Sequence, residues 1–569
     1  MKILFATANR IFFWNKINFV IEQITIIIEI AKFSDSQQLS LFLTFLVIMK
    51  LQIKNNFTAE LPADQSEINT PRQVQQSAYS YVLPKKPSNP SLIHASIEVA
   101  NAIGLSQEDI LSTDFLNTFS GNTVYPETKP FALCYAGHQF GNWAGQLGDG
   151  RAINLSEVVH DNKTYTLQLK GAGPTPYSRT ADGFAVLRSS IREHLCAEAM
   201  HYLGVPTTRS LSLMLSGDQV LRDVLYNGNP AYEKGAIVCR VAPSFIRFGS
   251  FELFASREDH DNLKLLADFT IKHHFPHIQQ EGVEKYLAFF QEVTQSTLKM
   301  IVHWQRVGFV HGVMNTDNMS IHGITIDYGP YGWLDDYNSS WTPNTTDNQY
   351  KRYRFGNQSE IALWNLYQLA NALYPLIQEA KPLETILDAF STDYEKEYLN
   401  MMQNKLGFQI KKEHDIVLIQ SLTQLLEKVE TDMTIFFRNL SNLSKADAAT
   451  TAFNSIKDAF YNEKDLDQTI LKDWHDWLEK YTIRINEEAL SDSERKEQMN
   501  LVNPKYVLRN YMAQLCIDDA DKGDYSLLNE LFEMLKKPYD EQPNFQKWFT
   551  KRPDWARDKV GCSMLSCSS

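Results

Sequence analysis

The segment that most constrains this chain runs from Gly308 to Pro330 and reads GFVHGVMNTDNMSIHGITIDYGP. Asn318 and Asp327 lie nine residues apart in it, on either side of MSIHGITI, which we expect to form a strand, a turn and a strand. Such a hairpin would bring an amide oxygen and a carboxylate to one point, and these hard oxygen ligands suit Mg²⁺ bridging phosphates. Asp317 adds a second carboxylate that could accept a proton from an attacking hydroxyl. By itself, the sequence TDN is more often an ordinary turn.

The same segment has the spacing of a protein-kinase catalytic core that lacks its catalytic aspartate. A kinase catalytic loop reads H-R-D-x-x-x-x-N, and a metal-binding D-F-G follows it. Here His311 opens the loop, Asn318 falls seven residues later, and Asp327-Tyr328-Gly329 stands in the place of D-F-G. The position of the missing aspartate is Val313. Asp317 is therefore the candidate for the proton transfer that Val313 cannot perform.

A glycine cluster upstream, GQLGDGR from Gly145 to Arg151, has the composition of a phosphate-binding loop. Gly148 and Gly150 would let the backbone approach a phosphate without obstruction by side chains, and Arg151 could add a positive charge. Taken alone, such a cluster is more often a plain turn.

A lysine and a glutamate follow in the order that kinases use. Lys170 ends the apolar strand pattern TLQLK, and Glu193 lies 23 residues later in the helical pattern SSIREHLCAEA. In kinases a strand lysine contacts the phosphates and pairs with a helix glutamate. A surface lysine and a solvated glutamate are the alternative.

Charged residues also occur in a loop and on a strand nearby. The loop GAGPTPYSRTADGFAVLR holds Asp182 and Gly183, and CRVAPSFIRFGSFE holds Arg240 and Arg247 among apolar residues. Arginines in apolar surroundings need anionic partners. A triphosphate would serve, and so would a buried ion pair with Asp or Glu.

The order of these motifs predicts an α+β, protein-kinase-like bilobal fold that binds ATP. β-type runs separated by glycines dominate from about 125 to 240, and helical periodicity dominates from about 255 onward. Residues 55–95 are rich in Pro, Ser, Asn and Gln and are expected to be irregular. The expected units are an extension outside the fold (1–48), an N-terminal arm (49–125), a β-rich N-lobe (126–250), a helical C-lobe (251–400) and a helical C-terminal extension with a Cys-Ser-Ser tail (401–569).

Composition excludes several other classes of function. A net charge of −13 argues against a nucleic-acid binder, which would need a basic surface. The six cysteines contain no CxxC pair, and the histidines of KHHFPHI lack the further ligands of a zinc site. No apolar run in residues 1–48 reaches the roughly 20 residues of a membrane span. We therefore expect a cytoplasmic monomer without stable membrane association.

Several long stretches together identify a family. YAGHQFGNWAGQLGDGRAINL, LQLKGAGPTPYSRTADGFAVLRSSIRE, HGVMNTDNMSIHGITIDYGPYGWLDDY, NPKYVLRNYMAQ and the Cys-Ser-Ser terminus resemble selenoprotein O and its bacterial cysteine-containing relatives. The resemblance runs from about residue 55 to the end of the chain. It implies a pseudokinase fold and protein adenylyltransferase activity, in which ATP binds inverted relative to kinases. AMP would then pass to Ser, Thr or Tyr hydroxyls of target proteins, with release of pyrophosphate.

The resemblance also implies roles for individual residues. Asp317 would accept the proton, Glu193 would orient Lys170, and Mg²⁺ or Mn²⁺ would lie between Asn318 and Asp327. The residues that would hold ATP are Gly148, Gly150, Arg151, Lys170, Asp182, Gly183, Arg240, Arg247 and Asp327.

One feature departs from the pattern of the relatives. Some of them carry a cysteine in the loop after GFLDDY that can pair with the C-terminal cysteine for redox control, and here Pro343 occupies that position. Cys567 therefore lacks that partner, and Cys562, Cys516 or a thiol of a target protein are the alternatives. For the function itself, an atypical kinase that transfers the γ-phosphate and a non-catalytic pseudokinase scaffold remain the competing hypotheses.

Overall fold

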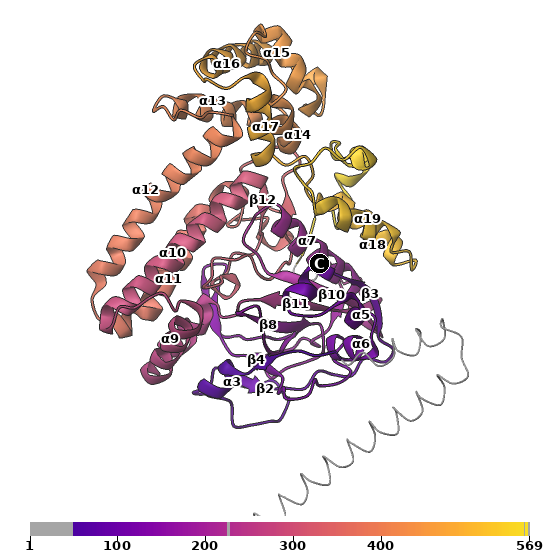
Figure 1. Ribbon diagram of the computed structural model, residues 1–569, viewed down its shortest axis with the longest axis vertical. Helices are drawn as coiled ribbons and strands as arrows, with labels where there is room; N and C mark the ends of the chain where they lie inside the picture. The colour runs from indigo at the N-terminus through magenta and orange to yellow at the C-terminus, as the bar shows by residue number, and fades with distance from the viewer. Residues whose placement is uncertain (1–48, 225–227, 563, 567–569) are drawn as a thin grey trace, which may run out of the picture.

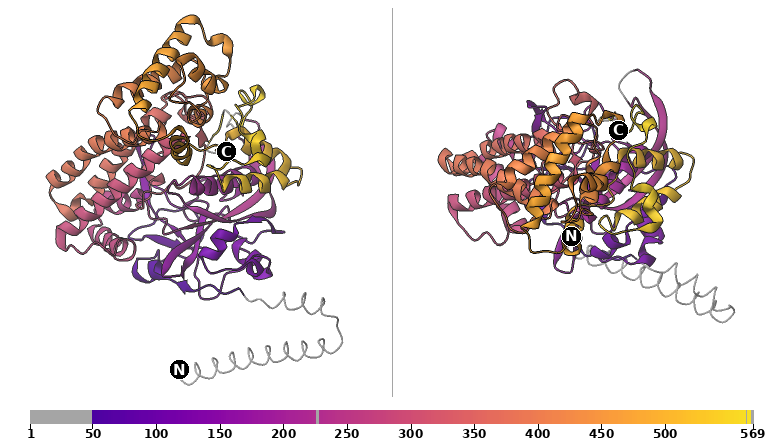
Figure 2. Two further views of the ribbon diagram at one scale, coloured as in Figure 1. Left: turned by 45° about the horizontal axis from the view of Figure 1, so that its top comes forward. Right: turned by 90° about the horizontal axis from the view of Figure 1, so that it is seen from above.

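The computed structural model describes residues 49–224, 228–562 and 564–566. The predictions made for residues 1–48 and for Cys567 lie outside this part of the chain. Figures 1 and 2 show a strand-rich part in indigo to magenta, joined to a part built of helices in pink, orange and yellow.

The strand-rich part is organised around one antiparallel sheet. Nine strands of the described chain form it in the order β2-β4-β7-β8-β11-β10-β3, with β1 beside β7 and β9 beside β11. The β7–β8 hairpin turns at Asp161 and Asn162, whose φ values of 47° and 59° are those a tight two-residue turn requires. The strands are β1 Ile53–Lys54, β2 Tyr79–Tyr81, β3 Ser91–Ala95, β4 Phe131–Leu133, β7 Ala152–His160, β8 Lys163–Lys170, β9 Ala185–Val186, β10 Arg209–Arg222 and β11 Ala231–Ala242.

Residues 55–95 are more ordered than their composition predicted. They contribute β2 and β3 to the sheet and also contain the short helix α3, so the expectation of an irregular segment is wrong in part. Tyr79 of β2 is 1% exposed, because it packs in tilted and edge-to-face contacts with the rings of Phe57, Tyr81 and Phe131. The short helices of this region are α3 Asn56–Glu60, α4 Ile97–Ala102, α5 Gln107–Ile110 and α6 Thr113–Phe119.

One long helix, α7 (Leu187–Tyr202), packs against β10 and β11. It ends just before Gly204, whose φ of +72° is one that glycine adopts readily. The helices α18 and α19 near the C-terminus pack against α7, and Figure 1 shows them beside the sheet. After the helical part, the chain therefore comes back to the strand-rich part at α18 and α19.

The helical part begins directly after β11. Its helix α10 ends at Gly308, whose φ of +74° turns the chain into β12 and the loop that starts at His311. The helices are α8 Phe248–Ser256, α9 His260–His274, α10 Gly282–Val307, α11 Gln358–Ile377, α12 Ala380–Lys405, α13 Asp415–Lys428, α14 Met433–Leu440, α15 Ala449–Ile456, α16 Gln468–Asn486, α17 Asp492–Val502, α18 Asn510–Ala520 and α19 Ser526–Leu535. Two small sheets accompany them, β5 Ala136–Gln139 with β6 Asn142–Gln146, and β12 Phe309–Val310 with β13 Gly332–Trp333.

The hairpin predicted between Asn318 and Asp327 is wrong. The segment makes a turn, but its two sides do not pair with each other. Ser320 instead bridges to Arg247, and Thr325 bridges to Thr207. Each side thus satisfies its backbone groups against a different neighbouring segment.

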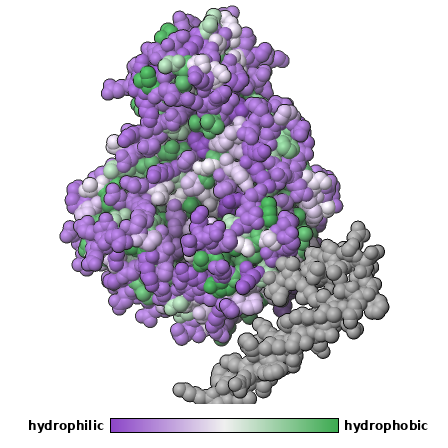
Figure 3. All heavy atoms as spheres, in the orientation of Figure 1, coloured by the Kyte–Doolittle hydropathy of each residue, from purple (hydrophilic) through white to green (hydrophobic). Residues whose placement is uncertain are grey.

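The observed architecture is a mixed α and β fold with a large antiparallel sheet and many helices, as expected. Hydrophilic side chains dominate the face seen in Figure 3. In the part of the chain that the structure describes, no helix is both long and apolar enough to span a membrane.

Candidate functional site

A cavity of about 610 Å³ lies where the sheet meets the loop that follows α10. Backbone and side chains from the glycine cluster, the strands β8 and β11, and the segment from Val313 to Pro330 line it. Ten of the predicted site residues reach it: Gly148, Gly150, Arg151, Lys170, Asp182, Gly183, Arg240, Asp317, Asn318 and Asp327.

The glycine cluster GQLGDGR packs so closely against Tyr177 that Gly148 has no room for a side chain. Gly148 has a φ of +141°, and a Cβ there would lie 2.4 Å from Cγ of Tyr177. Between the glycines, the buried carboxylate of Asp149 accepts hydrogen bonds from the backbone of Leu133 at 3.1 Å and from the amide of Gln168 at 3.2 Å. This network fixes the loop and presents its backbone to the cavity.

Lys170 and Glu193 form the predicted buried ion pair. Their side chains are 6% and 2% exposed, and Nε of Arg240 lies 2.9 Å from the second oxygen of Glu193. Lys170 and Arg240 share one face of the sheet, because Gln168, two residues before Lys170, lies opposite Arg240 in the strand register. Burial lowers the pKa of Lys170 despite the nearby Glu193. Glu193 therefore holds a lysine and an arginine at the cavity wall.

Asp327 lies at the centre of the charged residues. Its carboxylate accepts a hydrogen bond of 2.6 Å from Arg240 at one oxygen and of 2.6 Å from Arg247 at the other. Although burial alone would raise the pKa of Asp327, Arg247 and Arg240 hold it well below its usual range. Its φ of +56° is rare outside glycine, and strained residues of this kind cluster at functional sites.

Arg247 does not line the cavity. Its side chain is 2% exposed, and it donates to the backbone carbonyl of Asp317 at 2.7 Å besides its bond to Asp327. Within the described chain, carboxylates pair with both arginines. Arg240 pairs with Glu193 and Asp327, and Arg247 pairs with Asp327. Arg247 thus positions Asp317 and Asp327 without lining the cavity itself.

Asn318 and Asp317 lie together in a short 3₁₀ helix, Thr316–Asn318. Asn318 donates its amide nitrogen to the carbonyl of Val313 at 2.9 Å, so its amide oxygen remains the available ligand. Burial raises the pKa of Asp317 to about 6, although Gln139 and Arg247 act in the opposite direction. The Asp317 side chain therefore lies in a largely dry position.

A small hairpin, β5–β6, packs tightly over this helix. A Cβ at Gly137 would lie 2.9 Å from Oγ1 of Thr316 and 3.1 Å from Oδ1 of Asp317. From the same strand, Gln139 donates to Oδ2 of Asp317 at 3.2 Å, whereas Oδ1 is buried without a hydrogen-bond partner. Gln139 thus holds one oxygen of Asp317, and the other has no hydrogen-bond partner among the described residues.

At the position of the kinase aspartate, Val313 presents an apolar side chain to the cavity. His311 supports the loop from inside, since its imidazole bonds to the carbonyl of Ile326 at 2.9 Å and stacks on Trp304. His311 thus holds the segment around Val313 in place.

Two predicted nucleotide contacts lie at the open side of the cavity. Arg151 lines it and forms no ion pair within the described chain. Asp182 is paired with Arg222 at 2.7 Å and accepts a hydrogen bond from the backbone of Phe184 at 3.1 Å. The carboxylate of Asp182 thus orders the loop that carries Gly183.

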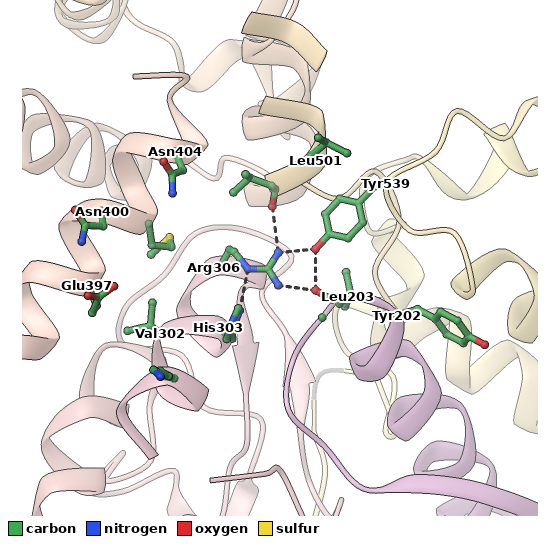
Figure 4. Close-up of a pocket in the computed structure, with 14 residues that line it drawn as sticks. Tyr202, Leu203, Val302, His303, Arg306, Glu397, Asn400, Asn404, Leu501 and Tyr539 are labelled. Carbon is green, nitrogen blue, oxygen red and sulfur yellow. Dashed lines mark hydrogen bonds between the residues drawn. The ribbon is translucent and has the colours of Figure 1, made fainter. Parts of the chain in front are cut away.

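A second cavity, of about 470 Å³, lies between the end of α7, α10 and α12 (Figure 4). Arg306 stands in the middle of it and donates to the carbonyls of Leu203 and Val502 and to the hydroxyl of Tyr539. These bonds join segments far apart in the chain, and none of the predicted site residues lines this cavity. Arg306 stabilises the packing there, and the first cavity is the candidate active site.

The histidines of KHHFPHI have ordinary partners. His273 bonds to Glu60 at 2.9 Å and His277 bonds to Glu292 at 2.5 Å. Among the residues that the structure describes, no cluster of three or more His, Cys, Asp or Glu is placed to hold a metal ion.

The cysteines of the described chain are free and buried. Burial raises the pKa of Cys516 to about 12 and that of Cys562 to about 11, which disfavours the reactive thiolate. The carbonyl of Pro343 accepts a hydrogen bond of 3.2 Å from the backbone of Leu565, so the tail lies against the loop that the family comparison singled out.

Three residues of the site escaped the sequence reasoning. Asp149 stands inside the glycine cluster itself, and its position between two glycines was the available signal. Gln139 and Gly137 lie within the family stretch YAGHQFGNWAGQLGDGRAINL but were assigned no role, because their contacts with Thr316–Asn318 form only when the β5–β6 hairpin folds.

Comparisons with known proteins identify the family of this chain. The family described as protein adenylyltransferase SelO matches residues 66–536. The chain belongs to the SelO family of protein adenylyltransferases. Among its relatives, the protein nucleotidyltransferase YdiU of Flavobacterium johnsoniae is 66% identical over 519 residues, which cover 91% of this chain and 99% of the relative. Proteins of the same name from Rhodopirellula baltica and Aromatoleum aromaticum are 53% and 52% identical, with the same coverage of 91% and 99%.

Proposed function

We propose that this chain transfers AMP from ATP to Ser, Thr or Tyr hydroxyls of target proteins and releases pyrophosphate. We further propose that it does so on a kinase-like bilobal fold, with residues 126–250 as N-lobe, 251–400 as C-lobe, 49–125 as an arm and 401–569 as an extension. Membership of an adenylyltransferase family supports the nucleotide transfer. The observation that carries the assignment to this site is the meeting of the Lys170–Glu193 pair, Asn318 and Asp327 around one cavity with Val313 in place of the kinase base.

The transfer follows from the positions of the charged groups. The acceptor oxygen forms a bond to the α-phosphorus, and the bond from that phosphorus to the oxygen bridging to the β-phosphate breaks. Pyrophosphate leaves with the bonding electrons, and Arg151 and Lys170 stabilise the charge that develops on it. The hydroxyl proton passes to the carboxylate of Asp317, which lines the cavity.

The inverted orientation of ATP explains why Val313 is compatible with catalysis. If the α-phosphate faces the acceptor, the reacting phosphorus is not where a kinase places the γ-phosphate. A carboxylate at position 313 would then be misplaced, whereas Asp317 lies under the β5–β6 hairpin on the same wall.

A divalent cation fits the donor set of the cavity. The amide oxygen of Asn318 and the carboxylate of Asp327 are hard ligands, and phosphate oxygens would complete the coordination. A bound Mg²⁺ or Mn²⁺ would neutralise phosphate charge. Arg240 and Arg247 keep Asp327 ionised, as a ligand of this kind must be.

Mass spectrometry tests the proposal. The protein is incubated with ATP, Mg²⁺ and a mixture of candidate proteins, and modified peptides are searched for the mass of AMP. We expect AMP on hydroxyl side chains, absent with Asp317→Asn and retained with the control Asp161→Asn in the exposed β7–β8 turn. A gain of the mass of a phosphate instead would favour the atypical kinase, and no modification by the wild type would favour a scaffold.

A further inference from the structure

A second arginine without a carboxylate partner lies beside Arg151 on the open side of the candidate active site. Arg179 lines the same cavity of about 610 Å³, and the residue is exposed to solvent. Like Arg151, it forms no ion pair and no side-chain hydrogen bond with any residue that the structure describes. Arg179 is therefore an accessible positive charge whose N–H groups are not used within the described chain.

The backbone segments that precede the two arginines are in close contact. A Cβ at Gly150 would lie 3.1 Å from the carbonyl oxygen of Tyr177 and 3.3 Å from Cα of Ser178. The hydroxyl of Ser178 also donates to the carbonyl of Gly150. Arg151 follows Gly150 and Arg179 follows Ser178, so each Cα lies only one residue, about 3.8 Å, from a contacting residue. Two unpaired arginines therefore leave the chain from neighbouring points beside the glycine cluster.

The backbone at Arg179 is held in a conformation that favours glycine. Its φ is +53°, and the N–H of Ala181 closes a tight turn around it by donating to the carbonyl of Ser178 at 2.8 Å. A residue other than glycine in this conformation costs roughly 1–2 kcal/mol, and such strained residues cluster at ligand sites. The hydroxyl of Thr175 donates to the carbonyl of Asp149 at 2.6 Å, which ties the loop to the glycine cluster. The loop therefore fixes where Arg179 stands at the cavity.

Carboxylates that line the cavity are paired with other arginines. Asp182, three residues after Arg179, pairs with Arg222 at 2.7 Å, and Asp327 pairs with Arg240 at 2.6 Å. Neighbouring positive charges without a carboxylate of their own favour an anionic ligand, and a guanidinium binds phosphate through two parallel N–H···O bonds. An ordinary solvated arginine on a surface loop is the alternative that the experiment must separate.

We propose that Arg179 binds a phosphate group of ATP together with Arg151. Arg179 would hold the phosphate chain from the exposed side of the cavity. Lys170 and Arg240, whose side chains are 6% and 4% exposed, would face it from the buried side. The inference rests on the proposed function, because it assigns one further contact to the same nucleotide.

Nucleotide binding tests this inference without requiring transfer. The analogue α,β-methylene-ATP, which cannot be cleaved at the α-phosphate, is compared with ADP, AMP and adenosine in Mg²⁺, and competition against a fluorescent nucleotide gives each Kd. Arg179→Gly removes the guanidinium and suits the left-handed backbone, so the loop keeps its shape. We expect it to raise the Kd of the ATP analogue about tenfold, the effect of one charge-assisted contact, and to leave the Kd of adenosine unchanged. The shortest nucleotide that loses affinity identifies the phosphate that Arg179 contacts.

Further variants and salt assign the effect to the charge of this side chain. Arg179→Lys keeps the charge but not the paired N–H groups, so it should lose less affinity for the ATP analogue than Arg179→Gly. The control Arg354→Gln should keep the wild-type Kd, because Arg354 donates only to the carbonyl of Lys351 and does not line the cavity. Added salt should reduce the difference between the wild type and Arg179→Gly, since it screens exposed charges.

Three results would overturn the inference. Arg179→Gly could bind the ATP analogue with the wild-type Kd, or it could lose affinity for adenosine and for the ATP analogue to the same extent. The third is a wild type that binds the ATP analogue no more tightly than adenosine.

A transfer assay separates this inference from the proposed function. Candidate acceptor proteins are incubated with ATP and Mg²⁺, and Arg179→Gly should raise the KM for ATP about tenfold. If Arg179→Gly loses affinity for the ATP analogue as predicted but the wild type transfers no AMP, the role of Arg179 stands and the proposed activity fails. If the wild type transfers AMP but Arg179→Gly binds the ATP analogue normally, the activity stands and the inference fails.

Discussion

Replacing Glu193 by Gln should destabilise the protein more than replacing its lysine partner. The Glu193 side chain is 2% exposed, and its carboxylate pairs with Lys170 and, at 2.9 Å, with Arg240. Glu193→Gln therefore leaves two buried cations facing a neutral amide. Removing one partner of a buried ion pair costs roughly 3–5 kcal/mol. Because Asp327 still lies 2.6 Å from Arg240, we expect a loss of about 3 kcal/mol in the free energy of unfolding.

Lys170→Met gives the matched comparison. In this variant the carboxylate of Glu193 keeps Arg240, so no buried charge is left without a partner. We expect a loss of about 1–2 kcal/mol, since an apolar side chain of similar length replaces a buried ammonium whose own desolvation was costly. Glu193→Gln should lose more unfolding free energy than Lys170→Met only if Glu193 pairs with both Lys170 and Arg240.

Urea unfolding followed by far-UV circular dichroism measures both variants. The exposed Glu395→Gln on α12 serves as control and should change the free energy by less than about 0.5 kcal/mol. An equal loss for both variants, or a larger loss for Lys170→Met, would refute the reasoning.

Three further predictions concern activity. Asp317→Asn should lower AMP transfer by about 10²–10⁴-fold, as for loss of a general base, while ATP affinity measured by calorimetry stays within a few-fold; an unchanged rate would remove Asp317 from the mechanism. Gly148→Ala should weaken ATP binding by at least about tenfold, because its Cβ would lie 2.4 Å from Cγ of Tyr177, and calorimetry showing wild-type affinity would contradict a phosphate-binding role for the loop. Removal of divalent cations with EDTA should abolish transfer, and added Mg²⁺ or Mn²⁺ should restore it; transfer that persists in EDTA would contradict a metal held by Asn318 and Asp327.

The parts of the site that could be predicted from sequence are those with fixed spacing in the chain. Lys170 at the end of a strand and Glu193 in the middle of a helix were placed as a pair, and the structure shows the ion pair. The β-type runs from about 125 to 240 and the helical periodicity from about 255 onward also predicted the kind of element found there. Local residue propensity and hydrophobic periodicity determine these features, so they can be predicted from the sequence alone.

The parts that could not be predicted depend on contacts between distant segments. The segment between Asn318 and Asp327 has the pattern of a hairpin, but Arg247 and Thr207 offer its backbone better-placed partners. Arg247 itself was predicted as a ligand contact, and only the folded chain shows it behind Asp327. Such outcomes are decided by tertiary packing, which a local pattern does not contain.

The N-terminal arm, residues 49–125, also contains structure that its composition did not predict. Its Pro and Asn residues predict irregular structure, but Tyr79 and Phe57 pack into an aromatic cluster with Phe131 of β4. This burial orders a segment whose composition alone would leave it without structure.

The most direct test of the central claim follows the phosphorus atoms of ATP. The purified protein is incubated with Mg²⁺, a mixture of candidate acceptor proteins and ATP labelled at either the α- or the γ-phosphate, with Asp327→Ala in parallel. We predict that protein is labelled from the α-phosphate only and that Asp327→Ala abolishes the label. Label that arrives only from the γ-phosphate would contradict AMP transfer and identify the protein as a kinase.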